Sequence, residues 1–252
     1  WAFGFALAYG GSTLGGFLAY GDFFLEGQAS TYFFQVVFAA TTATIVSGAV
    51  AERTKFSAYL LFQPFICGVI YPIVTHWVWS GQGWLGDLGF IDFAGSGVVH
   101  MVGGFAALAG VMIVGPRIGK YDDKGSPLPL PGSSMVAGAL GVFILWFGWF
   151  GFNGGSQLAM GTFDDITSVA TIFINTNLAA CAGVMTCAAI SRLVRGKTDV
   201  IMMLNGALGG LVAITAEPLT PSPIFAIIIG AIGGLIVFYG TLFLVKIKID
   251  DV

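Results

Sequence analysis

The chain has 252 residues, of which 56% are hydrophobic and only 9% are charged. Soluble domains carry about 25% charged residues, so ten basic and thirteen acidic side chains are too few to cover a soluble surface of this size. The composition excludes an ordinary soluble enzyme, a disordered chain and a nucleic-acid-binding protein, which would need a basic face. It favours an all-α, polytopic helical membrane protein.

Seven stretches approach the roughly 20 apolar residues that a helix needs to cross the hydrocarbon core. We predict full spans at about 31–51, 57–78, 91–114, 134–152, 165–190, 200–216 and 223–245. Residues 1–9 resemble the tail of an eighth span. The sequence therefore predicts a single transmembrane domain over residues 1–252, with about seven full spans plus the end of one.

All ten basic residues fall in loops on one side of these spans. They follow the first, third, fifth and seventh full spans, in clusters that include Arg53, Arg117, Arg192 and Lys246. The positive-inside rule makes these loops cytoplasmic in a multi-pass protein of the cell membrane. No Lys or Arg lies within a predicted span. This excludes a retinal-type lysine and a voltage sensor, and it favours a cation or a neutral molecule as cargo.

Three ionisable residues near the spans are candidates for chemistry. His100 lies nine residues into a span that is predicted to begin near Ile91, which puts it roughly 13 Å deep at 1.5 Å per residue. An ionisable group at that depth indicates a functional role, and a neutral imidazole bonded to a neighbouring helix is the alternative. Asp92 at the start of this span is typical of a helix cap, which would also add negative potential at a site entrance. His76 lies among tryptophans at the end of a span, and we interpret it as part of an interfacial aromatic belt.

Aromatic and hydroxyl side chains could form a cation site on the outer half. The predicted topology puts Phe38, Trp79, Phe152 and Ser156 above the level of His100. An aromatic face and a hydroxyl can hold a small cation through cation–π contact and a hydrogen bond. With 23 phenylalanines in the chain, however, a lipid-facing or core position is the stronger interpretation of any single one.

Enzyme motifs are not found in the sequence. The acidic residues cluster at span ends, and no Ser stands in a Gly-x-Ser-x-Gly elbow. The two histidines lack the spacing of metal ligands on a helix. We therefore predict a non-enzyme with no cofactor and no metal site.

Four blocks, in this order along the chain, closely resemble the signature of the ammonium transporter family (Amt/Mep/Rh). They are FQVVFAA at 34–40, GAVAER at 48–53, DFAGSGVVH at 92–100 and WFGFNGGS at 149–156. The Amt/Mep branch fits better than the Rh branch, because Trp79 and Ser156 are both present. The resemblance extends over essentially the whole chain.

The resemblance implies a fold of eleven spans built from two inverted five-span halves, a common class among transporters. The family assembles as a homotrimer with one pore per subunit. This chain would correspond to the end of the second span through the ninth, and would be a fragment lacking both ends. The second of the family's two pore histidines would then lie beyond Val252.

Residue by residue, the resemblance implies an outer ammonium site made of Trp79, Ser156, Phe38 and Asp92. Trp79 and Phe38 would offer π faces to ammonium and Ser156 a hydrogen-bond acceptor. Asp92 would stabilise the site without necessarily touching the ion.

Two further roles follow from the resemblance. Phe38 and Phe152 would be the stacked pair of the pore gate, and His100 would be a pore histidine. The implied function is an ammonium transporter or channel that recruits ammonium outside, deprotonates it and conducts ammonia. Its partners would be ammonium and ammonia, the lipid bilayer, the other subunits of the trimer and a cytoplasmic regulatory protein. An ammonium sensor of the same fold, or a channel for another small solute, are the alternatives.

Overall fold

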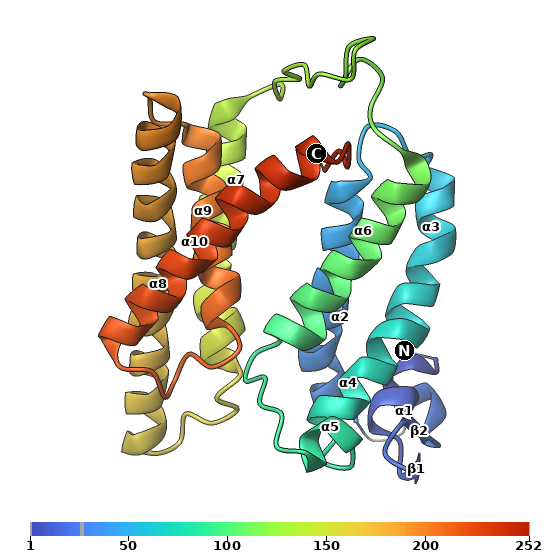
Figure 1. Ribbon diagram of the computed structural model, residues 1–252. Helices are drawn as coiled ribbons and strands as arrows, with labels where there is room; N and C mark the ends of the chain where they lie inside the picture. The colour runs from blue at the N-terminus through green and yellow to red at the C-terminus, as the bar shows by residue number, and fades with distance from the viewer. Residues whose placement is uncertain (1, 26–27, 252) are drawn as a thin grey trace. The chain divides into compact units, whose positions relative to one another are not determined.

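The computed structural model describes residues 2–25 and 28–251, which form two compact units. Unit 1 comprises residues 1–120 and 248–252, and unit 2 comprises residues 121–247. The elements of unit 1 are α1 (Gly4–Tyr9), β1 (Ser12–Leu14), β2 (Leu18–Tyr20), η1 (Phe23–Leu25), α2 (Ala29–Ala49), α3 (Phe56–Phe65), η2 (Ile66–Ile70), α4 (Tyr71–Trp79), α5 (Trp84–Asp87), η3 (Ser96–Met101) and α6 (Val102–Val114). Those of unit 2 are α7 (Met135–Gly155), α8 (Phe163–Arg195), α9 (Val200–Ile214) and α10 (Pro223–Lys246) (Figure 1).

Each predicted span forms a helix or a run of helices, so the polytopic helical class is confirmed. Among the residues that the structure describes, six helical segments are long and apolar enough to cross a membrane. The span predicted at 200–216 is the apolar helix α9, whose 15 residues fall short of the roughly 20 of a full crossing. The tail predicted at 1–9 contains the short helix α1.

Two runs in unit 1 are interrupted helices. Pro64 lies inside α3 and has no N–H to continue the helical ladder. The chain then widens into the π-helical turn η2 before α4 begins. The second run starts five residues later than the sequence predicts, at Ser96 rather than Ile91, with another π-helical turn, η3. The predicted start is wrong because Gly95 adopts a left-handed conformation (φ 103°), which breaks the helix before Ser96.

A small antiparallel hairpin of β1 and β2 follows α1, with Thr13 opposite Ala19. Gly15 and Gly16 in its loop both have positive φ (58° and 77°), a conformation that suits glycine. One apolar core cluster of unit 1 lies where α2, η2 and α6 meet. Its buried members are Val46, Ala49, Val50, Ile66, Ala107 and Val111.

Unit 2 is held together by close helix packing. Helices α8, α9 and α10 lie side by side (Figure 1). A Cβ atom built on Gly183 of α8 would overlap the carbonyl oxygen of Gly206 on α9, and one on Gly230 of α10 would overlap the carbonyl of Ala179. Such close backbone approach through small residues is a common way to pack helices in lipid.

Candidate functional site

Phe38 and Trp79 of unit 1 form an aromatic pair. Phe38, on α2, is only 2% exposed, and Trp79 is the last residue of α4. Their ring centroids are 5.6 Å apart with planes at 79°, an edge-to-face arrangement. The indole N–H of Trp79 donates to the Asp92 carbonyl at 2.7 Å. Because that donor is used, the indole can offer another molecule its π face.

The Asp92 carboxylate caps the helix that carries His100. Its Oδ1 accepts backbone N–H groups from Gly95 and Ser96 at 3.0 and 2.8 Å. Its Oδ2 accepts those of Gly97 and Val98, both at 2.8 Å. The residue is 5% exposed, so four donors surround a buried carboxylate in its ionised, acceptor-only form. The prediction of a cap is confirmed.

Gly95 connects the aromatic pair with His100. A Cβ atom at this position would lie 2.7 Å from Cγ2 of Val99 and 3.0 Å from the Trp79 indole, so the indole packs on bare backbone. Nδ1 of His100 lies 3.1 Å from the Gly95 carbonyl oxygen. A carbonyl only accepts, so Nδ1 carries the proton and Nε2 is the basic nitrogen of the neutral ring. Unit 1 therefore brings Phe38, Trp79, Asp92 and His100 into one connected set.

In unit 2, Phe152 and Ser156 lie one turn apart on α7. The Ser156 hydroxyl donates to the Phe152 carbonyl at 2.9 Å. Because its hydrogen is used in that bond, the hydroxyl oxygen is left as an acceptor, the role that the resemblance implies for it. Phe152 also packs on Trp149, with ring centroids 5.9 Å apart.

A buried polar network next to this pair was not predicted from the sequence. The Trp149 indole N–H donates to the Thr215 hydroxyl at 2.7 Å. Asn153 lies 3.2 Å from the same hydroxyl through its Oδ1, and its amide nitrogen donates to the Thr176 hydroxyl at 3.0 Å. Asn153, Thr176 and Thr215 are all fully buried. The network joins α7 to α8 and α9, and the only sequence signal for it is a lone Asn inside an apolar block.

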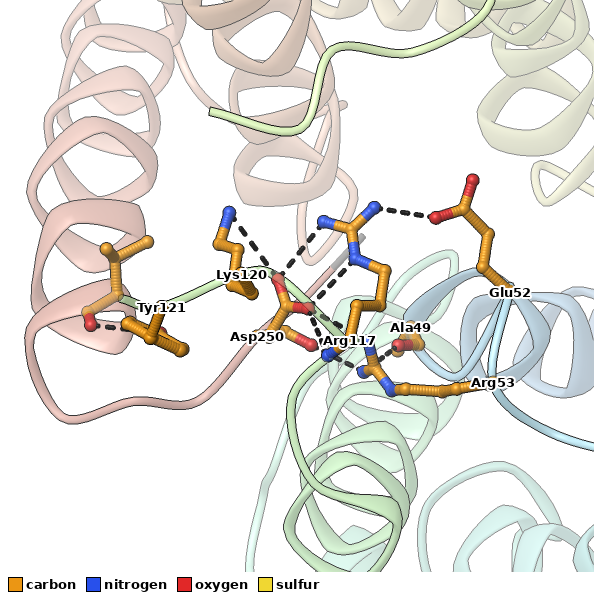
Figure 2. Close-up of polar contacts among 8 residues, drawn as sticks. Ala49, Glu52, Arg53, Arg117, Lys120, Tyr121 and Asp250 are labelled. Atoms are coloured by element: carbon orange, nitrogen blue, oxygen red, sulfur yellow. Dashed lines mark hydrogen bonds and ion pairs between the residues drawn. The ribbon is translucent and has the colours of Figure 1, made fainter. Parts of the chain in front are cut away.

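The second feature that sequence reasoning missed is an ion cluster around Asp250 in unit 1 (Figure 2). The fully buried Asp250 side chain accepts from Arg53 Nη1 at 3.1 Å and from Arg117 Nε and Nη2 at 2.9 and 3.1 Å. Lys120 Nζ lies 3.5 Å away, and Arg117 also pairs with Glu52 at 2.9 Å. Two loops predicted to be cytoplasmic thus meet on one carboxylate.

The electrostatics of this cluster favour the charged carboxylate. Burial of Asp250 opposes its ionisation, but the hydrogen bonds and charges from Arg117 and Lys120 outweigh that effect and hold its pKa at about 2. The same hydrogen bonds raise the pKa of Arg117 above its ordinary value. Asp250 and Arg117 therefore favour their charged forms near neutral pH.

The interpretation of His76 as part of an interfacial aromatic belt is wrong. The side chain is 1% exposed, and both ring nitrogens have partners on other segments of unit 1. The adjacent tryptophans suggested the belt, whereas the partners are distant in sequence. The predicted stacking of Phe38 on Phe152 stays a prediction, because the two residues belong to different units and each unit is described by itself.

The fold and these sites define a class, namely polytopic helical membrane proteins with interrupted helices that carry buried polar residues. A model of the Ammonium Transporter Family matches residues 1–252. The chain belongs to the ammonium transporter family.

Individual relatives agree with this assignment. The chain is 49% identical to the ammonium transporter Amt2 of Archaeoglobus fulgidus, over 100% of this chain and 56% of that protein. A solved structure of a sensor Amt protein superposes with a TM-score of 0.93 at 38% identity, covering 99% of this chain and 64% of that one. Mep2 of Candida albicans superposes with a TM-score of 0.87 at 30% identity, covering 98% and 56%. The chain thus spans a little over half to two thirds of the length of these relatives.

Proposed function

We propose that this protein transports ammonium across the cell membrane. Its family membership supports the substrate. The observation that carries the proposal is the arrangement of Phe38, Trp79 and Asp92: a buried aromatic pair next to a fully engaged, ionised carboxylate. The aromatic faces attract a cation, and the carboxylate adds negative potential. Ammonium can also donate hydrogen bonds, which a metal ion cannot do.

The proposed outer site consists of Trp79, Phe38, Ser156 and Asp92. Trp79 and Phe38 supply π faces, and Ser156 accepts a hydrogen bond because its own hydrogen is already donated within α7. Asp92 acts through its charge. Phe38 and Phe152 form the gate through which the solute passes.

Ammonium then loses its proton near the gate and passes His100 as ammonia. Placing a charge at the bilayer centre costs about 2.5–3.5 kcal/mol on insertion scales. Ammonium avoids this cost by deprotonation, which desolvation favours, and potassium has no proton to lose. His100 can act as a neutral hydrogen-bond acceptor through Nε2, since Nδ1 donates to Gly95. The imidazole would thus accept an N–H of passing ammonia.

The proposal also covers the assembly. The loops with Arg53 and Arg117 and the helix ends with Arg192 and Lys246 face the cytoplasm, and residues 1–252 belong to a single transmembrane domain of a homotrimer. A cytoplasmic regulatory protein would bind on the basic side. The meeting of two basic loops at Asp250 supports a common side for Arg53 and Arg117.

The test is uptake of labelled methylammonium by cells that lack other ammonium transporters and express the full reading frame. We expect saturable uptake that excess potassium does not inhibit. His100→Ala should slow uptake or admit potassium, and Trp79→Leu should raise KM. Uptake and ammonium/potassium selectivity that are both unchanged in His100→Ala would remove His100 from the mechanism. Equal passage of potassium by the wild type would refute the ammonium-specific pore.

An ammonium sensor is the second candidate, favoured by the superposition on the sensor Amt protein. A sensor would bind ammonium at the same aromatic site without net flux. Purified protein that binds ammonium, in liposomes that show no methylammonium flux, would support the sensor over the transporter. Flux that saturates in the same concentration range as binding would support the transporter.

A further inference from the structure

His76 is a buried polar residue of α4 that the proposed mechanism does not use. It lies three residues before Trp79, on the same helix, and is 1% exposed. Nδ1 lies 2.8 Å from the Ala8 carbonyl oxygen, and Nε2 lies 3.1 Å from the Thr13 hydroxyl. The imidazole therefore bridges three segments of unit 1: the end of α1, the first strand of the hairpin and the last turn of α4.

The Ala8 partner determines the role of one ring nitrogen. The Ala8 carbonyl can only accept, so Nδ1–H is the donor. Nε2 contacts the Thr13 hydroxyl, which also has the Leu18 carbonyl oxygen 3.3 Å away as an acceptor. Thr13 also lies 3.3 Å from the Gly16 N–H, so its hydroxyl oxygen anchors the hairpin loop as well. Both ring nitrogens are thus committed to the segment that runs from α1 into the hairpin.

The hairpin loop in turn packs on the connection after α4. The Trp77 indole N–H donates to the Phe17 carbonyl at 2.9 Å, and the backbone N–H of Trp84 donates to the Gly16 carbonyl at 3.2 Å. A Cβ atom on Gly16 would lie 3.0 Å from the Trp84 backbone nitrogen, so the two backbones are in direct contact. The bonds of the His76 ring and the contact between Gly16 and Trp84 therefore both attach the end of α4 to the segment that contains the hairpin.

We infer that His76 is a positioning residue for Trp79, through which the β1–β2 hairpin sets the affinity of the outer ammonium site. This inference rests on the proposed function. Residues three apart on a helix lie on neighbouring positions of one face, so a rotation of the last turn of α4 moves both side chains. Trp79 must keep its edge contact with Phe38 and its bond to Asp92, and a small displacement of a binding group lowers affinity steeply.

Four variants of the protein expressed from its full reading frame test the inference. His76→Leu removes both bonds, and His76→Asn keeps a donor near the Ala8 carbonyl. Thr13→Val removes only the hydroxyl, and Thr13→Ser is the matched control that retains it. KM and Vmax for methylammonium uptake are measured with the amount of folded protein in the membrane.

We expect His76→Leu and Thr13→Val to raise KM about three- to tenfold, the loss that one or two intramolecular hydrogen bonds represent. Vmax per folded transporter should stay within about twofold, because His100 and the gate are untouched. His76→Asn should recover part of the affinity, and Thr13→Ser all of it. A purely structural role would lower the amount of folded protein and leave KM unchanged.

Two outcomes overturn the inference and are distinguishable. If Trp79→Leu raises KM while Thr13→Val does not, the outer site stands and the positioning role of His76 is wrong. If Trp79→Leu itself leaves KM unchanged, the proposed site fails and the inference fails with it. Thr13→Val keeps the test decisive if His76→Leu does not fold.

Discussion

Unit 1 and unit 2 hold their helices together by different means. In unit 2, α8, α9 and α10 approach until glycine backbones touch, and Gly183 and Gly206 leave no room for side chains between them. In unit 1, two helical runs are broken, and buried polar groups such as Asp92 and His76 join the ends. Glycines at the contacts let the backbones of the regular helices α8, α9 and α10 approach closely. Broken helices present backbone groups and ionisable side chains, and three of the four predicted outer-site residues and the predicted pore histidine come from unit 1.

The largest predicted effect breaks the glycine packing of unit 2. Gly183→Val would place side-chain atoms on the Gly206 carbonyl, and backbone atoms cannot move aside as a side chain can. Overpacking of this kind costs about 3 kcal/mol or more. We expect no monodisperse protein in detergent by size-exclusion chromatography. Gly148→Ala on α7, where a Cβ meets nothing within 4 Å, is the control and should give normal yields.

The next effect tests the polar attachment of unit 1. Asp250→Asn removes the counter-charge of Arg53, Arg117 and Lys120, and breaking a buried ion pair costs about 3 kcal/mol or more. The carboxyl pKa is lowered from 3.8 to about 2, so its stabilisation is present above about pH 4 and is lost as the pH falls through 2.

The measurement for Asp250→Asn is thermal denaturation in detergent from pH 7 to pH 3. The gap in Tm between wild type and variant should be widest near neutral pH and narrow below pH 4. Glu52→Gln, at a side chain that is 62% exposed, should change Tm little. A gap that stays constant down to pH 3 would contradict the role assigned to the Asp250 charge.

The smallest effect concerns the buried polar network around Thr215 in unit 2. Thr215→Val leaves the Trp149 indole N–H without its acceptor, a loss of about 1–2 kcal/mol. We expect a small fall in Tm together with a change in Trp fluorescence. Thr215→Ser keeps the hydroxyl and should match the wild type. Uptake altered as strongly as by Trp79→Leu would show that the polar network around Thr215 acts in transport and is more than part of the helix packing.

The helices of both units could be predicted from the sequence because long apolar runs have few alternatives in a membrane. The start of the His100 helix could not, since Ile91, Phe93 and Ala94 are apolar and an Asp at position 92 is typical of the first residues of a helix. Only the left-handed Gly95 and the four bonds to Asp92 decide that the helix begins at Ser96. Propensity and hydropathy do not contain that information.

Some residues of the candidate site could be predicted from the sequence, whereas the long-range contacts of others could not. Trp79, Phe38 and Asp92 follow from the family signature, and in the structure Trp79 contacts the Phe38 ring and the Asp92 carbonyl. The partners of His76 and Asp250 were missed because they are distant in sequence: Ala8 is 68 positions from His76, and Arg117 is 133 from Asp250. The charges of the loops predict which side of the membrane the loops face, but they do not predict which basic and acidic side chains pair with each other.

The engagement of Asp92 has a consequence for ion coordination. Both carboxylate oxygens already accept two N–H groups each, which uses the lone pairs that lie in the carboxylate plane. A metal cation that sheds its water needs several oxygen ligands in return. Near Asp92 a metal cation would be attracted by the negative charge. It would find no free carboxylate oxygen there to replace the water that it had lost. The same field remains available to an ion that can bind through aromatic rings.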